Sequence, residues 1–273
     1  MKSEAPATLT GLKKTLTTFL KNYPNDRLCV SLSGGVDSMV LIHALHEMCR
    51  VCALHVNYNN RDDTQEEVTF VEDYCTTLGI TLEVLHINDV KRSEAQDRKV
   101  YEEYTRELRF DAYRKMKCPI VLGHNKEDTI ENMISNISSM KKLENIKGMT
   151  TECFERGTRI LRPFLNVSKE EIYAYASKHG VPHLPDSTPK WSRRGKLRDH
   201  VIPCLMKHEP KFFDGLFQLS KDLTMNYEKI HSGSLDVQLP PNITNAKHYL
   251  ANKFISHVLK THEVKKIDFF LDS

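Results

Sequence analysis

The fold is decided by residues 28–41, which read Leu28-Cys29-Val30-Ser31-Leu32-Ser33-Gly34-Gly35-Val36-Asp37-Ser38-Met39-Val40-Leu41. An apolar run of strand character leads into a turn with two glycines, and a second apolar run with helical character follows. Successive backbone N–H groups in such a turn, together with the N-terminus of the helix, form a pocket of partial positive charge that suits phosphate. The segment therefore predicts a phosphate-binding turn between a strand and a helix.

The side chains of this turn refine the prediction. Ser33 and Ser38 would donate hydroxyl hydrogen bonds to phosphate, whereas Asp37 would repel a bare phosphate and better suits a bridging Mg²⁺. Neither Gly-x4-Gly-Lys-Ser/Thr nor Gly-x-Gly-x-x-Gly occurs here, so the turn is not a Walker or Rossmann site. An ordinary β-to-α turn, with glycine for tightness and Asp or Ser as the cap, is the alternative. The candidate nucleotide-binding residues are Ser33, Gly34, Gly35, Val36, Asp37 and Ser38.

Outside this turn, apolar β-rich runs alternate with helical patterns. This alternation predicts an α/β fold with a parallel five-stranded sheet and helices on both of its faces. In the helix expected at 95–116, Tyr101, Tyr104, Leu108 and Ala112 predict an inward stripe. The expected strands are 28–32, 51–56, 82–87, 120–122 and 159–164, and the helices between them are 37–49, 64–78, 95–116 and 126–138.

The C-terminal part of the chain has a different character. Ser168 and Glu171 form a capping box that opens a helix, and Gly180 ends it. An irregular segment with three prolines follows, and helical patterns cover about 200–230 and 245–261. We predict a catalytic domain at 1–200 and a small helical domain at 201–273.

Composition narrows the class of protein. The chain has 273 residues, of which 40% are hydrophobic and 27% charged. No apolar run approaches the roughly 20 residues that cross a bilayer, so we expect no membrane span. Seven cysteines, an odd and scattered set, predict reduced thiols in a cytoplasmic protein. For Cys49-x-x-Cys52, buried structural thiols are the favoured interpretation over a metal or redox site.

Positive charge is concentrated in one segment. The net charge of the chain is only +3, but residues 187–211 hold seven basic and two acidic residues. Five of the basic residues fall within 190–198, where no carboxylate occurs, and cations at this density predict contact with a nucleic-acid backbone. The alternative is that Arg194 and Arg198 pair with acids such as Asp186. The candidate RNA-binding residues are Lys190, Arg193, Arg194, Lys196 and Arg198.

The hexapeptide 33–38 resembles the pyrophosphate-binding loop of the PP-loop ATP pyrophosphatases, which have an adenine nucleotide alpha hydrolase-like fold. Enzymes of this group cleave ATP between the α- and β-phosphates and adenylate a substrate. Three further segments resemble the tRNA(Ile)-lysidine synthase family within the group. Residues 55–61 look like its His-Val-Asn-His-Gly-Leu-Arg, and 123–132 are similar to its Gly-His-His-x-Asp-Asp-x-x-Glu-Thr. Residues 161–203 follow the order and spacing of its segment through the RNA-contacting element.

This resemblance implies an ATP-dependent carbon–nitrogen ligase that acts on tRNA. With ATP and Mg²⁺ it would adenylate C2 of a wobble cytidine, attach free lysine, and release AMP and pyrophosphate. A PP-loop tRNA 2-thiolase and a non-catalytic nucleotide- or RNA-binding module are the alternatives. The resemblance implies that His55, Asn57 and Gly123 join the loop in binding the nucleotide, that Asp37 and Asp128 bind Mg²⁺, and that Asp37, Asp128, Arg106, Arg109 and His124 are catalytic.

Four of these residues have plainer alternatives. His55 would also fit a buried histidine at a strand end, and Asp128 a first-turn acid favoured by the helix dipole. Arg106 and Arg109 would fit a solvated helix face, where Arg106 would pair with Glu102.

The chain departs from the family pattern on the substrate side. Tyr58, Asn59 and Asn60 replace His-Gly-Leu, Asn125 replaces the second histidine, and Gly195 stands where the family favours asparagine. Bacterial members often continue into a further C-terminal domain, so the chain resembles a minimal form.

Overall fold

A computed structural model describes residues 7–24, 26–59, 64–88, 98–186 and 192–231. The chain divides into two compact units, Met1–Thr224 and Met225–Ser273. The sheet and the candidate site lie in the first unit. No helix in the described ranges is both long enough and apolar enough to cross a membrane. The helix expected at 245–261 lies outside the described residues.

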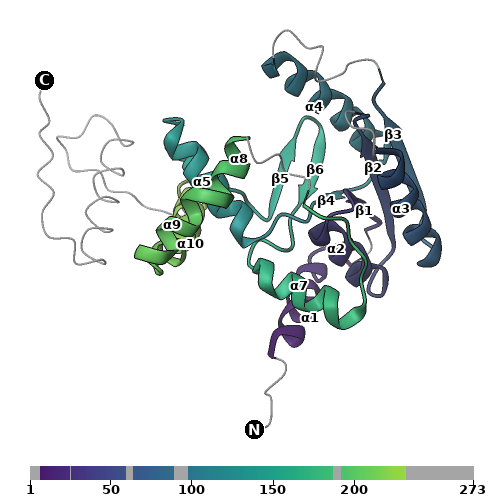
Figure 1. The fold of residues 1–273 in the computed structure, drawn as a ribbon, viewed down its shortest axis with the longest axis horizontal. Coiled ribbons are helices and arrows are strands. Elements are labelled where there is room, and N and C mark those ends of the chain that lie inside the picture. Colours follow the sequence, from purple (N-terminus) through teal and green to yellow (C-terminus); the bar gives the residue numbers. More distant parts are fainter. Residues whose placement is uncertain (1–6, 25, 60–63, 89–97, 187–191, 232–273) are drawn as a thin grey trace, which may run out of the picture. The chain divides into compact units, whose positions relative to one another are not determined.

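One six-stranded sheet forms the centre of the first unit, with strand order β3-β2-β1-β4-β6-β5 (Figure 1). All neighbours pair in parallel except β5 and β6, which are antiparallel. The five expected parallel strands are confirmed. The strands are β1 (Leu28–Ser31), β2 (Val51–Asn57), β3 (Leu82–His86), β4 (Ile120–Val121), β5 (Glu152–Glu155) and β6 (Thr158–Leu161).

The sixth strand, β5, was not expected from the sequence. It is an edge strand whose residues alternate between exposed and half-buried, and it carries a glutamate at each end. A two-residue turn joins it to β6, with φ of 46° at Arg156 and 77° at Gly157. Positive φ at both positions is typical of the tightest hairpins, but arginine is an unusual residue at the first of them. The hairpin signal is therefore weak in the sequence.

The predicted helices are present with small shifts at their ends. Gly180 ends α7 in the left-handed conformation, with φ of 62°, as its position after the capping box predicts. The helical pattern at 200–230 is split at Pro210. The helices are α1 (Ala7–Leu20), α2 (Val36–His46), α3 (Thr64–Thr77), α4 (Arg98–Lys115), α5 (Lys126–Ser138), α6 (Leu143–Ile146), α7 (Lys169–His179), α8 (Arg193–Lys196), a π-helical turn at Leu197–Val201, α9 (Ile202–His208) and α10 (Phe212–His231).

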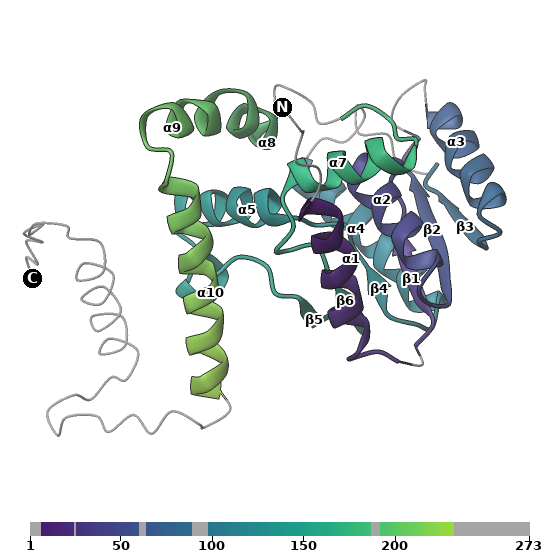
Figure 2. The ribbon, with the colours of Figure 1, turned by 90° about the horizontal axis from the view of Figure 1, so that it is seen from below.

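Helices cover both faces of the sheet, as predicted. Val30 and the other residues of one strand face pack with α1, α2, α3 and α7 in one core cluster. Cys29, which points to the opposite face, packs in a second cluster with Phe110 and Tyr113 of α4. Figure 2 shows α1, α2 and α7 lying together. The carboxyl ends of β1 and β4 stay uncovered between these layers, where open α/β sheets bind ligands.

The inward stripe of α4 needs one correction. Tyr101 and Ala112 are buried as predicted, but Tyr104 is 40% exposed. Thr105 is buried in its place, and its hydroxyl donates to the carbonyl of Tyr101 at 2.9 Å. Leu108 is half-buried. The local hydrogen bond lets Thr105 occupy the inner face, so a pattern built on apolar residues alone misplaced Tyr104.

The cysteines form no disulfide among the described residues. Cys52 is buried in β2, and Cys49 is half-buried with its thiol 3.5 Å from the carbonyl oxygen of Leu45. The favoured interpretation of this pair as structural thiols agrees with this placement.

Candidate functional site

The phosphate loop between β1 and α2 is held by its own serines. The hydroxyl of Ser38 accepts from the backbone N–H of Ser33 at 3.1 Å and donates to the carbonyl of Gly35 at 3.0 Å. The two serine hydroxyls lie 3.1 Å apart. These bonds order the loop, and Gly35 is the residue that precedes the first turn of α2.

Two glycines allow the loop to pack closely against other segments. Gly34 has φ of 80°, and a Cβ there would lie 2.8 Å from a methyl of Leu184. Leu184 also donates its N–H to the carbonyl of Gly34 at 2.9 Å. A Cβ on Gly123, after β4, would lie 3.0 Å from the backbone carbon of Asp37. Only glycine permits this approach, which brings the residues after β4 to the loop.

Asn125 joins the two carboxylates to which the sequence assigns metal binding. Its side chain accepts from the N–H of Asp128 at 3.0 Å, and Asp128 accepts from the N–H of Asn125, which completes a capping box for α5. The amide of Asn125 also donates to Asp37 Oδ1 at 3.0 Å. Asn125, which stands where the family has its second histidine, therefore places an amide between Asp37 and Asp128.

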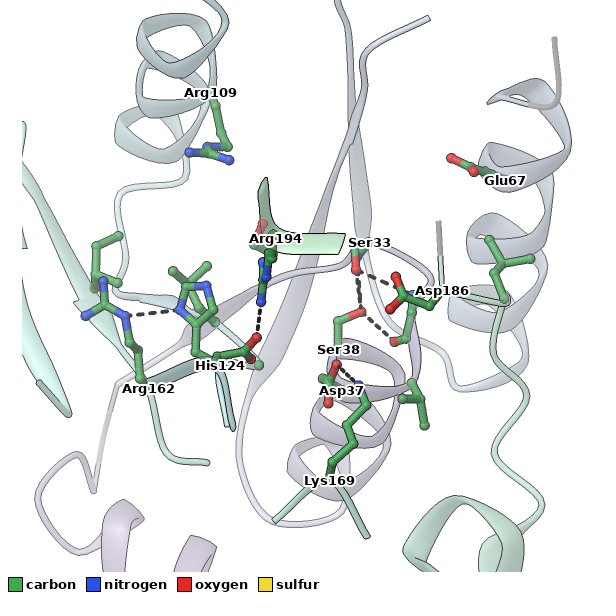
Figure 3. Close-up of a pocket in the computed structure, with 18 of the residues that line it drawn as sticks. Ser33, Asp37, Ser38, Glu67, Arg109, His124, Arg162, Lys169, Asp186 and Arg194 are labelled. Atoms are coloured by element: carbon green, nitrogen blue, oxygen red, sulfur yellow. Dashed lines mark hydrogen bonds and ion pairs between the residues drawn. The ribbon is translucent and has the colours of Figure 1, made fainter. Parts of the chain in front are cut away.

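A cavity of about 460 Å³ opens beside the loop at the carboxyl ends of β1 and β4. Figure 3 shows charged side chains converging on it from both sides. The predicted residues that line it are Ser33, Gly35, Val36, Asp37, Ser38, Arg106, Arg109, Gly123, His124, Asp128, Arg194 and Arg198. The sequence did not single out Ser31, Glu67, Tyr113, Lys169 or Tyr173, which also line it.

His55 and Asn57 do not line this cavity. Both are buried, at 3% and 5% exposure. His55 Nδ1 lies 2.8 Å from the carbonyl of Leu32, and burial lowers the pKa of the imidazole. Asn57 accepts from the N–H of Asn59 at 2.8 Å, and Asn59 has a left-handed φ of 46°, which asparagine tolerates better than most residues. The structure thus gives these two residues supporting contacts behind the loop, as in the plainer alternative for His55.

Arg106 and Arg109 of α4 both reach the cavity, but their surroundings differ. Arg106 pairs with Glu155 of β5 and is partly exposed. Arg109 lies 3.4 Å from the hydroxyl of Tyr58, and its Nε is buried with no hydrogen-bond partner in the described part of the chain. A half-buried guanidinium whose Nε–H has no partner is a candidate ligand for an anionic or carbonyl oxygen.

His124 is held as a neutral imidazole. Arg162, which is 8% exposed, places its Nε 3.2 Å from His124 Nδ1. A guanidinium only donates, so Nδ1 accepts and the proton of the ring is on Nε2. Burial lowers the pKa of His124 from its usual 6.5 to about 4, against the pull of Asp128 and with the help of Arg162. His124 is therefore a neutral hydrogen-bond donor.

An acidic pair lies at the start of α5 and holds two arginines. Asp128 and Glu131 are 7% and 5% exposed. Arg194 Nε lies 2.6 Å from Glu131, and its Nη2 contacts Asp128. Arg198 lies 3.2 Å from Asp128 and 2.8 Å from Asp186, and its Nε contacts Glu131. Two of the five candidate RNA-binding cations thus make the internal ion pairs of the alternative interpretation.

The remaining basic candidates are placed only in part. Lys196 is exposed, and Gly195 beside it is buried with its N–H 3.0 Å from the hydroxyl of Ser192. Arg193 begins α8, and its side chain is not described. Lys190 lies outside the described residues.

The residues that were missed carried different signals. Glu131 and Arg162 lie inside the quoted family segments, so their motifs could have marked them. Lys169 follows the capping residue Ser168. Its contact with the loop could not be predicted, because it depends on how α7 packs beside the loop. Glu67 reaches the cavity from α3, and its local pattern gives no sign of this.

Comparisons with known proteins agree with this geometry. A family model described as PP-loop domain matches residues 8–205. A tRNA(Ile)-lysidine synthase from Bacteroides thetaiotaomicron is 29% identical over 76% of this chain and 50% of its own length. One from Mycoplasma pneumoniae is 24% identical over 91% of this chain and 89% of its own. The chain spans about half the length of several of the curated relatives that it matches, and a third of a bifunctional TilS/HprT protein of Listeria innocua.

A solved structure supports the fold. The U34-tRNA thiolase NcsA from Methanococcus maripaludis, with its 4Fe-4S cluster, is similar with a TM-score of 0.65 at 16% identity. The similarity covers 87% of this chain and 83% of that one. The family model covers far more than half of the chain and includes the loop, the cavity and the acidic pair. The chain belongs to the PP-loop domain family of ATP-utilising proteins.

Proposed function

We propose that the chain is an ATP-dependent tRNA-modifying ligase that adenylates C2 of a wobble cytidine and attaches lysine there, with release of AMP and pyrophosphate. One observation carries the proposal: one cavity is lined by the Ser33–Ser38 loop and by Asp128, which belongs with Glu131 to a buried acidic pair that holds two arginines. An activated oxygen and an attacking amine need such a pair of neighbouring subsites. The named relatives support tRNA and lysine as the substrates.

In the first step, the loop would hold the β- and γ-phosphates of ATP. The C2 oxygen of the cytidine attacks the α-phosphate, and the bond to the bridging oxygen of pyrophosphate breaks. Negative charge grows on the leaving group, so fixed N–H groups and the hydroxyls of Ser33 and Ser38 stabilise it. The Nε2–H of His124 and the free N–H of Arg109 are suited to oxygens nearer the α-phosphate.

Mg²⁺ is the metal that this chemistry would use, and Asp37 fits it. Mg²⁺ in nucleotide sites commonly takes one or two carboxylates and fills its other positions with phosphate oxygens and water. Asp37 lies in the cavity with its side chain 26% exposed, so its carboxylate is accessible. Both carboxylates already have partners: Asp37 contacts Asn125 and Lys169, and Asp128 contacts two arginines and Asn125. Asp128 fits less directly, because it is only 7% exposed. When bound, the metal would neutralise phosphate charge.

In the second step, the ε-amine of lysine displaces AMP from C2. Asp128 and Glu131 would bind the ammonium, because they already neutralise two guanidinium groups. Asp128 would accept the proton as the amine attacks. Arg194 and Arg198 would then lose some of their ion pairs with these acids. They would form new ion pairs with phosphates of the tRNA backbone.

The rest of the assignment is also a proposal. Lys190, Arg193 and Lys196 would contact the tRNA backbone with Arg194 and Arg198. The catalytic domain would comprise 1–200, and 201–273 would form a helical domain that contacts tRNA. The cytoplasm would be the site of action. The thiolase alternative is less favoured, because Cys49 and Cys52 lie at the amino end of β2, and the cavity lies at the carboxyl ends of the strands.

The decisive experiment is mass analysis of tRNA nucleosides after incubation with the protein, ATP, Mg²⁺ and labelled lysine. We expect a cytidine that carries lysine, together with AMP and pyrophosphate. The variant Asp128→Asn should fail to complete the reaction and should accumulate adenylated RNA. ADP as the main product would contradict the mechanism, and a thiolated nucleoside formed with a sulfur donor would favour the thiolase.

A further inference from the structure

Lys169 places a cation at the phosphate loop. It is the first residue of α7, and its ammonium nitrogen lies 2.5 Å from Asp37 Oδ2. The same side chain lines the cavity with Ser33 and Ser38 (Figure 3). A residue 132 positions downstream of Asp37 therefore completes the surface of the loop.

Several contacts hold this lysine in place. The capping box of Ser168 and Glu171 fixes the start of α7, and the backbone N–H of Lys169 donates to Glu127 at 3.0 Å. The ammonium also lies 5.5 Å from the centre of the Tyr173 ring. The side chain keeps 32% of its surface exposed, so the ammonium is positioned and still reaches the cavity.

The charges around the loop do not yet include a cation that would neutralise the leaving pyrophosphate. The loop has no Walker lysine, although a departing pyrophosphate concentrates negative charge. Five arginines also line the cavity. Arg106 pairs with Glu155, and Arg194 and Arg198 pair with the acids of α5. Arg162 donates to His124, and Arg109 contacts the hydroxyl of Tyr58 on the side proposed for the α-phosphate. Within the described ranges, Lys169 is the cavity cation whose ion pair is with a residue of the loop.

We propose that Lys169 binds the β- and γ-phosphates of ATP and stabilises pyrophosphate as it leaves. This inference rests on the proposed role of the Ser33–Ser38 loop as a pyrophosphate cradle. The bond between the α-phosphorus and the bridging oxygen breaks as the substrate oxygen bonds to phosphorus, and the electron pair goes to pyrophosphate. Lys169 stays protonated and transfers no proton. An ammonium has three donors, so its contact with Asp37 leaves two for phosphate oxygens.

The test is calorimetric titration of the protein with inorganic pyrophosphate in the presence of Mg²⁺. Lys169→Met should weaken binding by at least about tenfold, the scale of one charge-assisted contact. Lys169→Arg keeps a cation and should lose less. Lys178→Met, at an exposed position on the same helix, is the matched control and should bind as the wild type does. Circular dichroism checks that every variant is folded.

A double-variant cycle separates direct contact from mere neutralisation of Asp37. If Lys169 contacts phosphate, adding Lys169→Met to Asp37→Asn should weaken binding by a similar further factor. Equal binding by Asp37→Asn and the double variant would overturn the inference, as would wild-type affinity in Lys169→Met. Absence of pyrophosphate binding by the wild type would instead overturn the cradle itself, and the role of Lys169 with it.

Discussion

The two ends of the cavity are built in opposite ways. The loop end consists of consecutive residues, and its geometry comes from backbone hydrogen bonds and two glycines that admit close neighbours. The acidic end depends on side chains: Asp128 and Glu131 are neutralised by arginines more than 60 positions downstream. A subsite made of local backbone can be recognised in a sequence, whereas one made of distant side chains appears only when the chain is folded.

The sharpest way to break the loop end is Asp37→Ala. The carboxylate is the proposed Mg²⁺ ligand, and its removal should lower pyrophosphate release by about 10²–10³-fold or more. Stability should change little, because the side chain lies at the cavity rather than in the core. Pyrophosphate release and thermal unfolding are measured together. Near-normal turnover would show that Asp37 does not hold the metal.

Gly123→Ala tests whether close backbone contact defines the loop. The added Cβ would lie 3.0 Å from the backbone carbon of Asp37, so the loop or β4 must shift, at a cost of about 1–3 kcal/mol. We expect weaker ATP binding and a lower melting temperature. Gly215→Ala is the control, because nothing lies within 4 Å of the added atom. Full ATP affinity in Gly123→Ala would contradict the close-contact argument.

The double variant Arg194→Ala, Arg198→Ala tests the acidic end. It leaves two buried carboxylates without their cations, which should lower the free energy of unfolding by about 2 kcal/mol, less than for a fully buried pair because the arginines are partly exposed. Lys196→Ala is the comparison at an exposed position. It should leave stability unchanged and reduce the salt slope of tRNA affinity by roughly 0.7–0.9. If the double variant were as stable as Lys196→Ala, the ion pairs of Arg194 and Arg198 would not stabilise the fold.

The smallest effect concerns pH. The folded protein holds His124 neutral down to about pH 4, whereas the unfolded chain protonates it near 6.5. The unfolded state therefore binds more protons in this window, and stability falls as the pH is lowered through it. This group contributes at most about 1.4 kcal/mol per pH unit. His124→Gln should reduce the slope, measured by denaturant titration, while His208→Gln on exposed α9 should not. An unchanged slope in His124→Gln would contradict the neutral imidazole.

The sequence predicted most of what is local. The parallel strands and the loop follow from short apolar runs and from glycine positions, which act through nearby backbone. Strand β5 was missed because a charged edge strand has little apolar pattern. Tyr104 was misplaced because Thr105 is buried instead: its hydroxyl donates to the carbonyl of Tyr101 on the same helix, so burial leaves no hydrogen bond unmade.

The candidate site was predicted less completely, for a physical reason. Its loop residues, His124 and Asp128 follow strand ends, so topology alone brings them together. Arg162 and Lys169 act through ion pairs and hydrogen bonds to distant residues. Arg194 and Arg198 have the same dense basic pattern whether they face RNA or internal acids, so composition could not choose between the two.

The shared amide of Asn125 has a consequence for how substrates bind. It donates to Asp37 at the loop end and caps the helix that carries Asp128 at the acidic end. A ligand that draws Asp37 away from this amide acts on the N-terminus of α5. Thermodynamic linkage then makes the effect reciprocal: the factor by which a phosphate ligand changes affinity for a cation equals the factor by which the cation changes affinity for phosphate. One side chain thereby gives the two subsites a route to cooperativity that requires no movement of the sheet.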